Sequence, residues 1–220
     1  MPEATAEAPA LNSVPPISSR DRILYAGKRL FARNGYENTS TVAIAREAGT
    51  SESQLMKHFG SKQGLLAAIL DCGWDSVIHR VRSAQNEGPV MTRLVGALEA
   101  MVSELENDPQ LKELVTLEAC RIRKDNHDVV MSQGYRQFSE LIGTLLQDMR
   151  GKGELPGDVN LDALCAALMG TAEGLLRGQV VASRSQARRD YTLTDMRKVL
   201  EVLVAAFGAA SAQPLRVVNG

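Results

Sequence analysis

The chain has 220 residues, of which 44% are hydrophobic, 23% are charged and 4% are aromatic. This composition is typical of a soluble globular protein with a substantial core, in one large or two small domains. No apolar run is long enough to span a bilayer, and the acidic N-terminal stretch lacks the features of a signal peptide, so we expect a cytoplasmic protein.

The charge of the chain is unevenly distributed, although its net value is only −1. From Arg20 to Lys62 there are eight Lys or Arg residues against four acidic ones, which gives +4 there and leaves −5 for the rest. A basic segment on an acidic body predicts a polyanionic partner for the first part of the chain. The counts alone fit scattered, solvated charge equally well.

Helices are expected throughout, because Ala, Leu, Glu and Arg are abundant and Pro and Gly rarely interrupt the apolar segments. Residues 1–16 are rich in Pro, Ala and Glu, and we expect them to be disordered. Serines that cap helices and glycines that end them then divide the basic segment. The expected helices run from Ser18 or Ser19 to Gly35, from Ser40 or Thr41 to Gly49, and from Ser51 to Gly60, with a fourth after Ser61.

Longer helices follow and predict a larger body. Apolar residues recur at helical spacing in five segments, and polar turns or glycines separate them. The segments are 91–105, 111–123, 135–149, 161–181 and 194–207, and a small polar tail begins at residue 208. No strand pattern accompanies them, so the predicted fold class is all-α.

Two of the short helices, joined through Gly49, Thr50 and Ser51, predict a helix-turn-helix. On the second of these helices Leu55 and Phe59 point inward by their spacing. The outward side chains are then small or hydrogen-bonding, a set that suits base edges in the major groove of DNA. An ordinary three-helix corner has the same spacing and is the alternative.

The residues themselves resemble the DNA-binding domain of the TetR (tetracycline repressor) family over positions 17 to 77. The resemblance is carried by Ile23-Leu24, Leu30-Phe31-Ala32, Gly35-Tyr36, Thr39-Ser40, Ile44-Ala45, Ala48-Gly49, Ser51, Leu55, His58-Phe59, Ser61-Lys62 and Leu65. It implies a helix-turn-helix domain at 17–77, a helical ligand-binding and dimerisation domain at 78–208, and a tail at 209–220. The implied function is transcriptional regulation by a homodimer on double-stranded DNA.

The resemblance also implies a DNA-binding face. It places Glu52, Ser53, Gln54 and Lys57 at base edges, Thr41, His58 and Lys62 at phosphates, and Val42 against a thymine methyl group. Ser51 and Met56 complete the expected face. Met56 stands where the family usually has tyrosine, and Thr50 and Gln63 replace the usual valine and glutamate. The contact at position 56 is the one that these departures put in doubt.

A stripe of small residues on the long helix near the C-terminus predicts the dimer seam. Helical glycine is unfavourable by about 1 kcal/mol relative to alanine, but it allows two helices to approach closely. The expected interface residues are Ala163, Ala167, Gly170, Gly174 and Gly178, with Leu200, Leu203 and Phe207 from the last helix. A kink or a close contact within the chain is the alternative.

Aromatic and sulfur-containing residues of the body predict a mostly apolar ligand pocket. The candidates are Trp74, Met91, Met101, Tyr135, Phe138 and Met169. Glu173 lies in an apolar helix, where an unpaired carboxylate would be unfavourable. Arg177, one turn further on, is its expected partner, and a carboxylate that faces the ligand is the sharper interpretation.

Enzymatic motifs are missing from the sequence, and no cofactor or metal is expected. Asp75 and His79 could be half of a metal site, but a charge-assisted pair is the simpler interpretation. Cys72, Cys120 and Cys165 lack zinc or redox spacing and are expected to be buried, reduced thiols, while His127 is expected in an exposed turn.

The sequence therefore predicts a repressor that binds a palindromic operator and is released by a small, largely apolar ligand. A DNA-binding regulator without such an effector is the first alternative, and a helical enzyme using Asp75 and His79 or a cysteine is the second.

Overall fold

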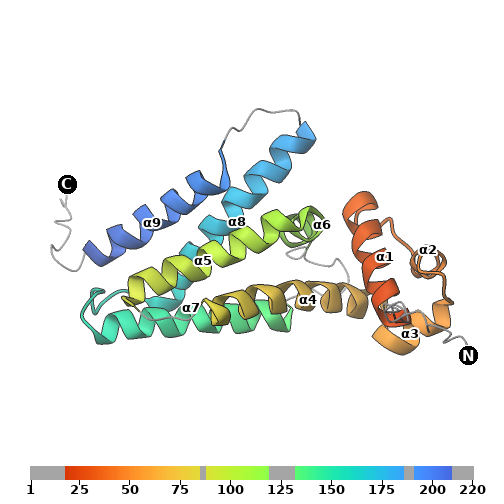
Figure 1. Ribbon diagram of the computed structural model, residues 1–220, viewed down its shortest axis with the longest axis horizontal. Coiled ribbons are helices and arrows are strands. Elements are labelled where there is room, and N and C mark those ends of the chain that lie inside the picture. The colour runs from red at the N-terminus through yellow and green to blue at the C-terminus, as the bar shows by residue number, and fades with distance from the viewer. Residues whose placement is uncertain (1–17, 85–87, 119–131, 186–190, 210–220) are drawn as a thin grey trace, which may run out of the picture.

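The computed structural model describes residues 18–84, 88–118, 132–185 and 191–209. Within these ranges the secondary structure is entirely helical, as predicted. Figure 1 shows a small group of helices at one end of an elongated molecule and a larger bundle that forms the rest. None of the described helices has both the length and the apolarity to cross a membrane.

Three short helices form the small end: α1 (Ser19–Asn34), α2 (Thr41–Glu47) and α3 (Glu52–Phe59). Each begins where the sequence places a serine cap. The hydroxyl oxygens of Ser18, Ser40 and Ser51 accept hydrogen bonds from the backbone N–H three residues further on. These bonds satisfy donors that have no partner inside the helix, and so they fix where each helix starts.

Helix α4 (Lys62–Ser83) joins the small end to the body, as Figure 1 shows. Ser61 caps its first turn. Helix α4 packs on α1 and α3 of the small end and on α5 and α7 of the body. A single unbroken helix therefore fixes the small end relative to the bundle.

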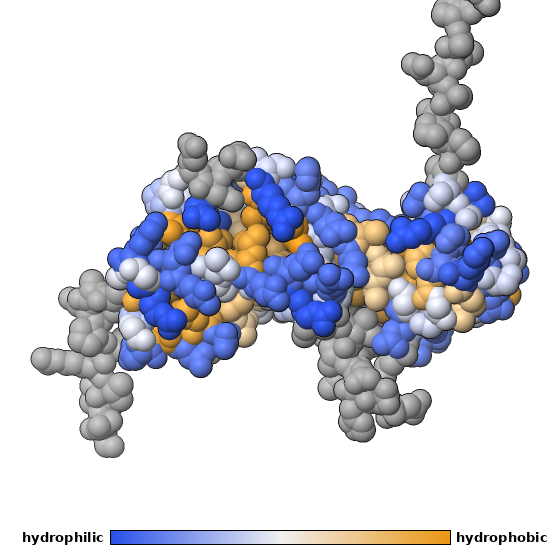
Figure 2. All heavy atoms as spheres, turned by 90° about the horizontal axis from the view of Figure 1, so that it is seen from below, coloured by the Kyte–Doolittle hydropathy of each residue, from blue (hydrophilic) through white to orange (hydrophobic). Residues whose placement is uncertain are grey.

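The body contains α5 (Val90–Asn107), α6 (Pro109–Glu113), the π-helical turn η1 (Leu114–Glu118), α7 (Gln133–Gly151), α8 (Leu161–Ser185) and α9 (Leu193–Ala209). Helix α7 packs against α4, α5 and α8, and α9 packs mainly against α5. One continuous apolar core extends from Ile23 in α1 to Val204 in α9. On the face shown in Figure 2, deep orange apolar patches reach the surface over the body.

One expected helix differs from the structure. The segment 111–123 was predicted to be a single α-helix, but α6 starts at Pro109 and passes into η1 after Glu113. Proline at the first position suits a helix start, and Asp108 caps it by accepting from the N–H of Leu111. The rest of that segment, the tail at 1–16 and nearly all of the tail at 209–220 lie outside the described residues.

Candidate nucleic-acid interface

A glycine conformation and two hydrogen bonds fix the turn between α2 and α3. Gly49 has a φ of 61°, a left-handed conformation that glycine adopts without strain. The N–H of Thr50 donates to the carbonyl of Ala45 at 2.9 Å. Arg22 of α1 donates through Nε to the carbonyl of Ala48, also at 2.9 Å. These contacts fix the angle between α2 and α3, which is the geometry that a helix-turn-helix requires.

Helix α3 has one buried side and one exposed side, as predicted. Leu55 is fully buried in the same core as Ile23, Ile44 and Leu65. The exposed residues of α3 are Glu52, Ser53, Gln54, Met56, Lys57 and His58. Most of them carry hydrogen-bonding groups, which suit base edges and phosphates.

Neighbouring elements support this exposed side. The Thr41 hydroxyl at the start of α2 donates to the Glu52 carboxylate, and Ser51 and Ser53 share a hydrogen bond of 2.9 Å. His58 Nε2 lies 3.0 Å from Ser19 Oγ at the start of α1. The first turns of α1 and α2 therefore flank α3 and belong to the same surface. Beside them Val42 is 59% exposed and Met56 is 42% exposed.

Lys62 points into the protein, which differs from the predicted phosphate contact. Its Nζ donates to the carbonyls of Tyr36 and Thr39 at 3.0 Å each, and that of Glu37 lies at 3.5 Å. It also lies 4.4 Å from the centre of the Tyr36 ring. An ammonium group has three donors, and these carbonyls use them. Lys62 therefore ties the start of α4 to the loop between α1 and α2.

Sequence reasoning missed several residues of this surface. Ser19 contacts His58, and the Arg20 guanidinium lies 5.6 Å from the centre of the Phe59 ring. Arg46, at the end of α2, is exposed and forms no ion pair with any residue that the structure describes. The excess of basic residues in this segment was a signal for both arginines, but it did not indicate their positions.

In the body, three of the predicted ligand residues form an aromatic group. The Trp74 ring lies 5.4 Å from Tyr135, edge to face, and 5.3 Å from Phe138. Gly134 permits this packing, because a Cβ there would lie 2.3 Å from the Cβ of Trp74. Trp74 and Phe138 are buried, so Tyr135 is the member of the group that reaches a surface.

A groove of about 550 Å³ between α7 and α8 includes Tyr135 and Met169 in its lining. Glu173 follows Met169 by one turn of α8 and is hydrogen-bonded to Tyr135. Burial raises the pKa of Glu173, and the Tyr135 hydrogen bond and Arg177 only partly offset that rise. The predicted influence of Arg177 is present, and Tyr135 is a further partner.

The two remaining ligand candidates lie elsewhere. Met101 is fully buried in the core of the body. Met91 lines a different groove, between α5 and α9, together with Glu99 and Arg197. The structure thus brings together Trp74, Tyr135, Phe138, Met169 and Glu173 around α7 and α8, and it does not bring Met91 or Met101 to the groove.

The small-residue stripe of α8 lies on the outside of the chain. Ala163, Ala167, Gly170 and Gly174 are exposed, and Gly178 is half-buried. A Cβ at Gly170 or Gly174 would meet nothing within 4 Å. The alternative of a close contact within the chain therefore does not apply to these two glycines.

On α9 the predicted interface needs a correction. Leu200 is fully buried within the chain, so its side chain belongs to the core and is closed to a second copy. Leu203 and Phe207 are half-buried. The exposed large apolar residues of this helix are Leu193 at its start, at 37%, and Val199 and Val202, at 41% and 64%.

Other predicted groups also have defined surroundings. Cys72 is exposed rather than buried, and Cys165 is half-buried, while Cys120 and His127 lie outside the described residues. The expected Asp75–His79 pair is replaced by a contact of 3.5 Å between His79 and Ser83. Across the parts of the chain that the structure describes, no three His, Cys, Asp or Glu side chains form a group that could hold a metal ion.

A capped helix-turn-helix with a polar exposed face, joined by α4 to a helical body, defines a DNA-binding transcriptional regulator. Residues 23–69 match the family model described as "Bacterial regulatory proteins, tetR family". This part of the chain is therefore a DNA-binding domain of the tetR type.

Known proteins of similar sequence and fold agree with this assignment. The chain is 28% identical to the nucleoid occlusion factor SlmA of Photobacterium profundum, covering 73% of this chain and 83% of that protein. It is 24% identical to the HTH-type transcriptional regulator UidR of Escherichia coli K12, covering 72% and 80%. The solved structure of the regulator FadR from Bacillus subtilis, in complex with stearoyl-CoA, has the same fold. Its TM-score is 0.70 at 18% identity, and the match covers 83% of this chain and 96% of that one.

Proposed function

We propose that this regulator is a cytoplasmic repressor, without enzymatic activity, that binds a palindromic operator as a homodimer and leaves it when a small, largely apolar ligand binds. Residues 17–77 would bind DNA, and residues 78–208 would bind the ligand and form the dimer. The observation that carries the proposal is the exposed side of α3, where six solvent-exposed side chains surround a buried Leu55.

At the DNA, Glu52, Ser53, Gln54 and Lys57 would read base edges in the major groove. Gln54 has the amide group that pairs with adenine through two hydrogen bonds. Val42 is exposed enough to contact a thymine methyl group, and Met56 would add an apolar contact in place of a phosphate hydroxyl. His58, Thr41 and the neighbouring Ser19 and Arg20 would face phosphates.

A dimer explains why small residues lie on an exposed side of α8. In a dimer with two-fold symmetry, each copy contributes the same surface to the contact. If that surface includes this stripe, the small side chains let the two α8 helices approach closely. Val199 and Val202 of α9 would extend the contact. Two recognition helices related by a two-fold axis would then read an inverted repeat.

The groove between α7 and α8 supports an effector site in the body. Tyr135, Met169 and the nearby Glu173 give it aromatic, apolar and ionisable groups. FadR of Bacillus subtilis, whose fold is the same, was solved with stearoyl-CoA, a ligand with a long apolar chain. A ligand that prefers the dimer conformation unable to bind DNA would release the operator by shifting the population.

Selection from a random duplex library tests the DNA-binding part. The full chain should enrich an inverted repeat with half-sites about one helical turn apart, or a multiple of that distance. A selection without protein provides the baseline. Failure to enrich any sequence above that baseline would contradict the proposal.

A panel of apolar compounds tests the effector part. Those that bind the native protein but not the unfolded chain should raise its melting temperature. The same compounds should lower its affinity for the selected operator. Stabilisation by highly charged metabolites alone, with none from apolar compounds, would contradict an apolar effector.

A further inference from the structure

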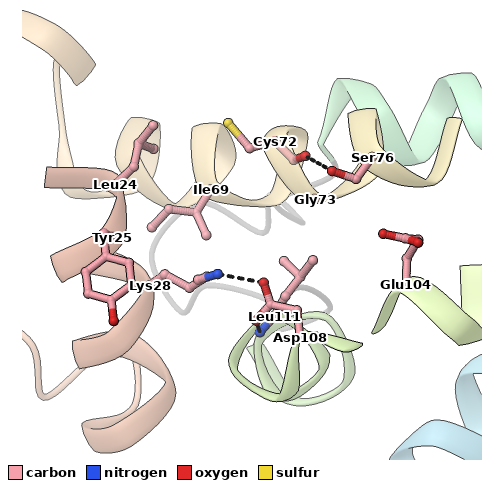
Figure 3. Close-up of a pocket in the computed structure, with 10 residues that line it drawn as sticks. All are labelled: Leu24, Tyr25, Lys28, Ile69, Cys72, Gly73, Ser76, Glu104, Asp108 and Leu111. Carbon is pink, nitrogen blue, oxygen red and sulfur yellow. Dashed lines mark hydrogen bonds and ion pairs between the residues drawn. The ribbon is translucent and has the colours of Figure 1, made fainter. Parts of the chain in front are cut away.

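A cavity of about 320 Å³ lies where α1 and α4 meet the corner between α5 and α6 (Figure 3). Leu24 of α1, Ile69 of α4 and Leu111 of α6 give it an apolar wall. Gly73 allows this arrangement, because a Cβ there would lie only 2.3 Å from Cδ2 of Leu111. The cavity therefore lies at a closely packed junction between the DNA-binding end and the body.

Charged groups line the other side of the same cavity. Lys28 Nζ of α1 donates to Asp108 Oδ2 at 2.6 Å, as the dashed line in Figure 3 marks. Asp108 Oδ1 also accepts the N–H of Leu111 at 3.0 Å. Glu104 lines the cavity too, and its Oε1 is paired with Arg80. Among the described residues, the second oxygen of Glu104 has no hydrogen-bond partner.

We propose that this cavity binds a small primary amine with an apolar body. Lys28 and Arg80 already pair with the two carboxylates of this site, so an incoming donor can bind the free oxygen of Glu104 or replace Lys28 at Asp108. The amine would donate to Glu104 and Asp108 and take the place of Lys28 at Asp108. Its apolar part would cover Leu24, Ile69 and Leu111, and the small volume limits it to about one ring or a short chain.

Other ligand classes fit the cavity less well. An anion would face both carboxylates and compete with Asp108 for Lys28. A neutral apolar molecule would cover charged groups without pairing them, which is unfavourable. The amine matches both the apolar wall and the free carboxylate oxygen of Glu104.

The site is separate from the proposed effector groove and from the proposed dimer seam. Its lining comes from α1, α4, α5 and α6, whereas the groove lies between α7 and α8 and the seam lies on α8 and α9. An occupant that displaces Lys28 from Asp108 removes a direct ion pair between α1 and the residue that caps α6.

Calorimetric titration of the full chain with 4-phenylbutylamine tests the proposal, with 4-phenylbutanoate as the matched anion. The amine should bind and the carboxylate should not. Glu104→Gln should weaken amine binding about tenfold, because a charge-assisted hydrogen bond is lost. Glu99→Gln is the matched control, since Glu99 is also an ion-paired glutamate of α5 but lies outside the cavity. Its amine affinity should not change.

A second variant should change the amine affinity in the opposite direction. Lys28→Met removes the group that competes for Asp108, so it should tighten amine binding. Loss of binding in Lys28→Met, together with binding of 4-phenylbutanoate to the unmodified chain, would show an anion site and overturn the proposal. Equal effects of Glu104→Gln and Glu99→Gln, or the absence of amine binding, would overturn it as well.

Discussion

Lys62 stabilises the DNA-binding end from within. Its ammonium group holds the loop between α1 and α2 through backbone carbonyls and lies over the Tyr36 ring. A backbone carbonyl accepts a stronger hydrogen bond from a charged ammonium group than from a neutral donor. The residue therefore supports the position of α2, and through it the position of α3, without pointing at a phosphate.

Replacing Lys62 with methionine should lower the free energy of unfolding by about 1–3 kcal/mol, because hydrogen bonds to a charged group and a cation–π contact are lost. Urea denaturation measures this. Lys57→Met, at an exposed position of α3, should change stability by less than about 0.5 kcal/mol. If Lys62→Met kept full stability and instead lowered the salt dependence of DNA binding by about one unit, the side chain would hold a phosphate after all.

Glu173 links stability to pH. Burial raises the pKa of its carboxyl group in the folded chain, so the native state binds its proton more tightly than the unfolded state does. Stability must then fall as the pH rises from the unfolded pKa to the raised folded pKa. Below this window the contribution is fully present, and above it the contribution is lost.

The variant Glu173→Gln should remove that part of the pH dependence, because glutamine is neutral at every pH and can still bond to Tyr135. Denaturation curves at several pH values across the window, for both proteins, provide the comparison. The two proteins should differ most at the upper end, where the variant is relatively more stable. Parallel stability curves for both would contradict the raised pKa.

At the scale of elements, the connection between α3 and α4 fixes the recognition helix at its C-terminal end. Gly60 has a φ of 72°, and Ser61 caps α4 immediately afterwards. Gly64 lies directly against this turn, since a Cβ there would be 2.1 Å from the carbonyl oxygen of Phe59. The contact involves backbone, which cannot move aside as a flexible side chain can.

Gly64→Ala should therefore displace the end of α3, lower stability and weaken operator binding. Gly96→Ala is a control of opposite sign, because Gly96 is an exposed helical residue of α5 with open space around it. Alanine there should stabilise the protein by about 0.5–1 kcal/mol. Thermal melting and operator titration of both variants give the result. A stabilising effect at Gly64 would mean that the turn adapts more easily than this packing allows.

The starts of α1 to α4 were predictable because capping depends on residues next to each other in the chain. Serine caps and left-handed glycines act within one turn, so the sequence carries them directly. The face of α9 was harder to predict. Its apolar residues form two rows, one of Leu200, Leu203 and Phe207 and the other of Val199 and Val202. Packing against α5 decides which of the two rows is buried.

The direction of Lys62 was unpredictable for a similar reason. Its acceptors lie more than twenty residues away, in the loop after α1. The exposed side of α3 followed from the spacing of Leu55 and Phe59, but its neighbours Ser19 and Arg20 come from a different helix. The π-helical turn after α6 has no sequence signal that we recognise.

For the whole molecule, the proposed dimer accounts for exposed small and apolar residues on adjacent helices. The stripe on α8 has no neighbour in the described chain at Gly170 and Gly174, and Val202 of α9 is largely exposed. Small residues at a seam bring two helix backbones close together, so a large side chain there must separate them. A Cβ at Gly174 would meet nothing within 4 Å inside the described chain, so the side chain of a leucine there starts from an open surface.

Gly174→Leu should therefore raise the dissociation constant of the dimer by about tenfold or more while the folded chain stays intact. Sedimentation equilibrium measures association, and circular dichroism checks folding. Leucine at Gly96, an exposed glycine of α5 that lies outside the proposed seam, serves as the control and should leave association unchanged. An unaltered dissociation constant for Gly174→Leu would place the seam elsewhere.

The central claim is that the exposed side of α3 reads a DNA sequence, and Gln54 tests it most directly. Anisotropy titrations of the unmodified chain, Gln54→Ala and Gln137→Ala, on the selected operator and on a scrambled duplex at one salt concentration, provide the measurement. Gln137 is an exposed glutamine of α7, far along the chain from the helix-turn-helix, and its replacement should affect neither DNA. Gln54→Ala should lose about 1–3 kcal/mol on the operator and almost nothing on the scrambled duplex, because base contacts carry specificity and phosphate contacts do not. Equal losses on both DNAs, or no loss on the operator, would contradict the claim.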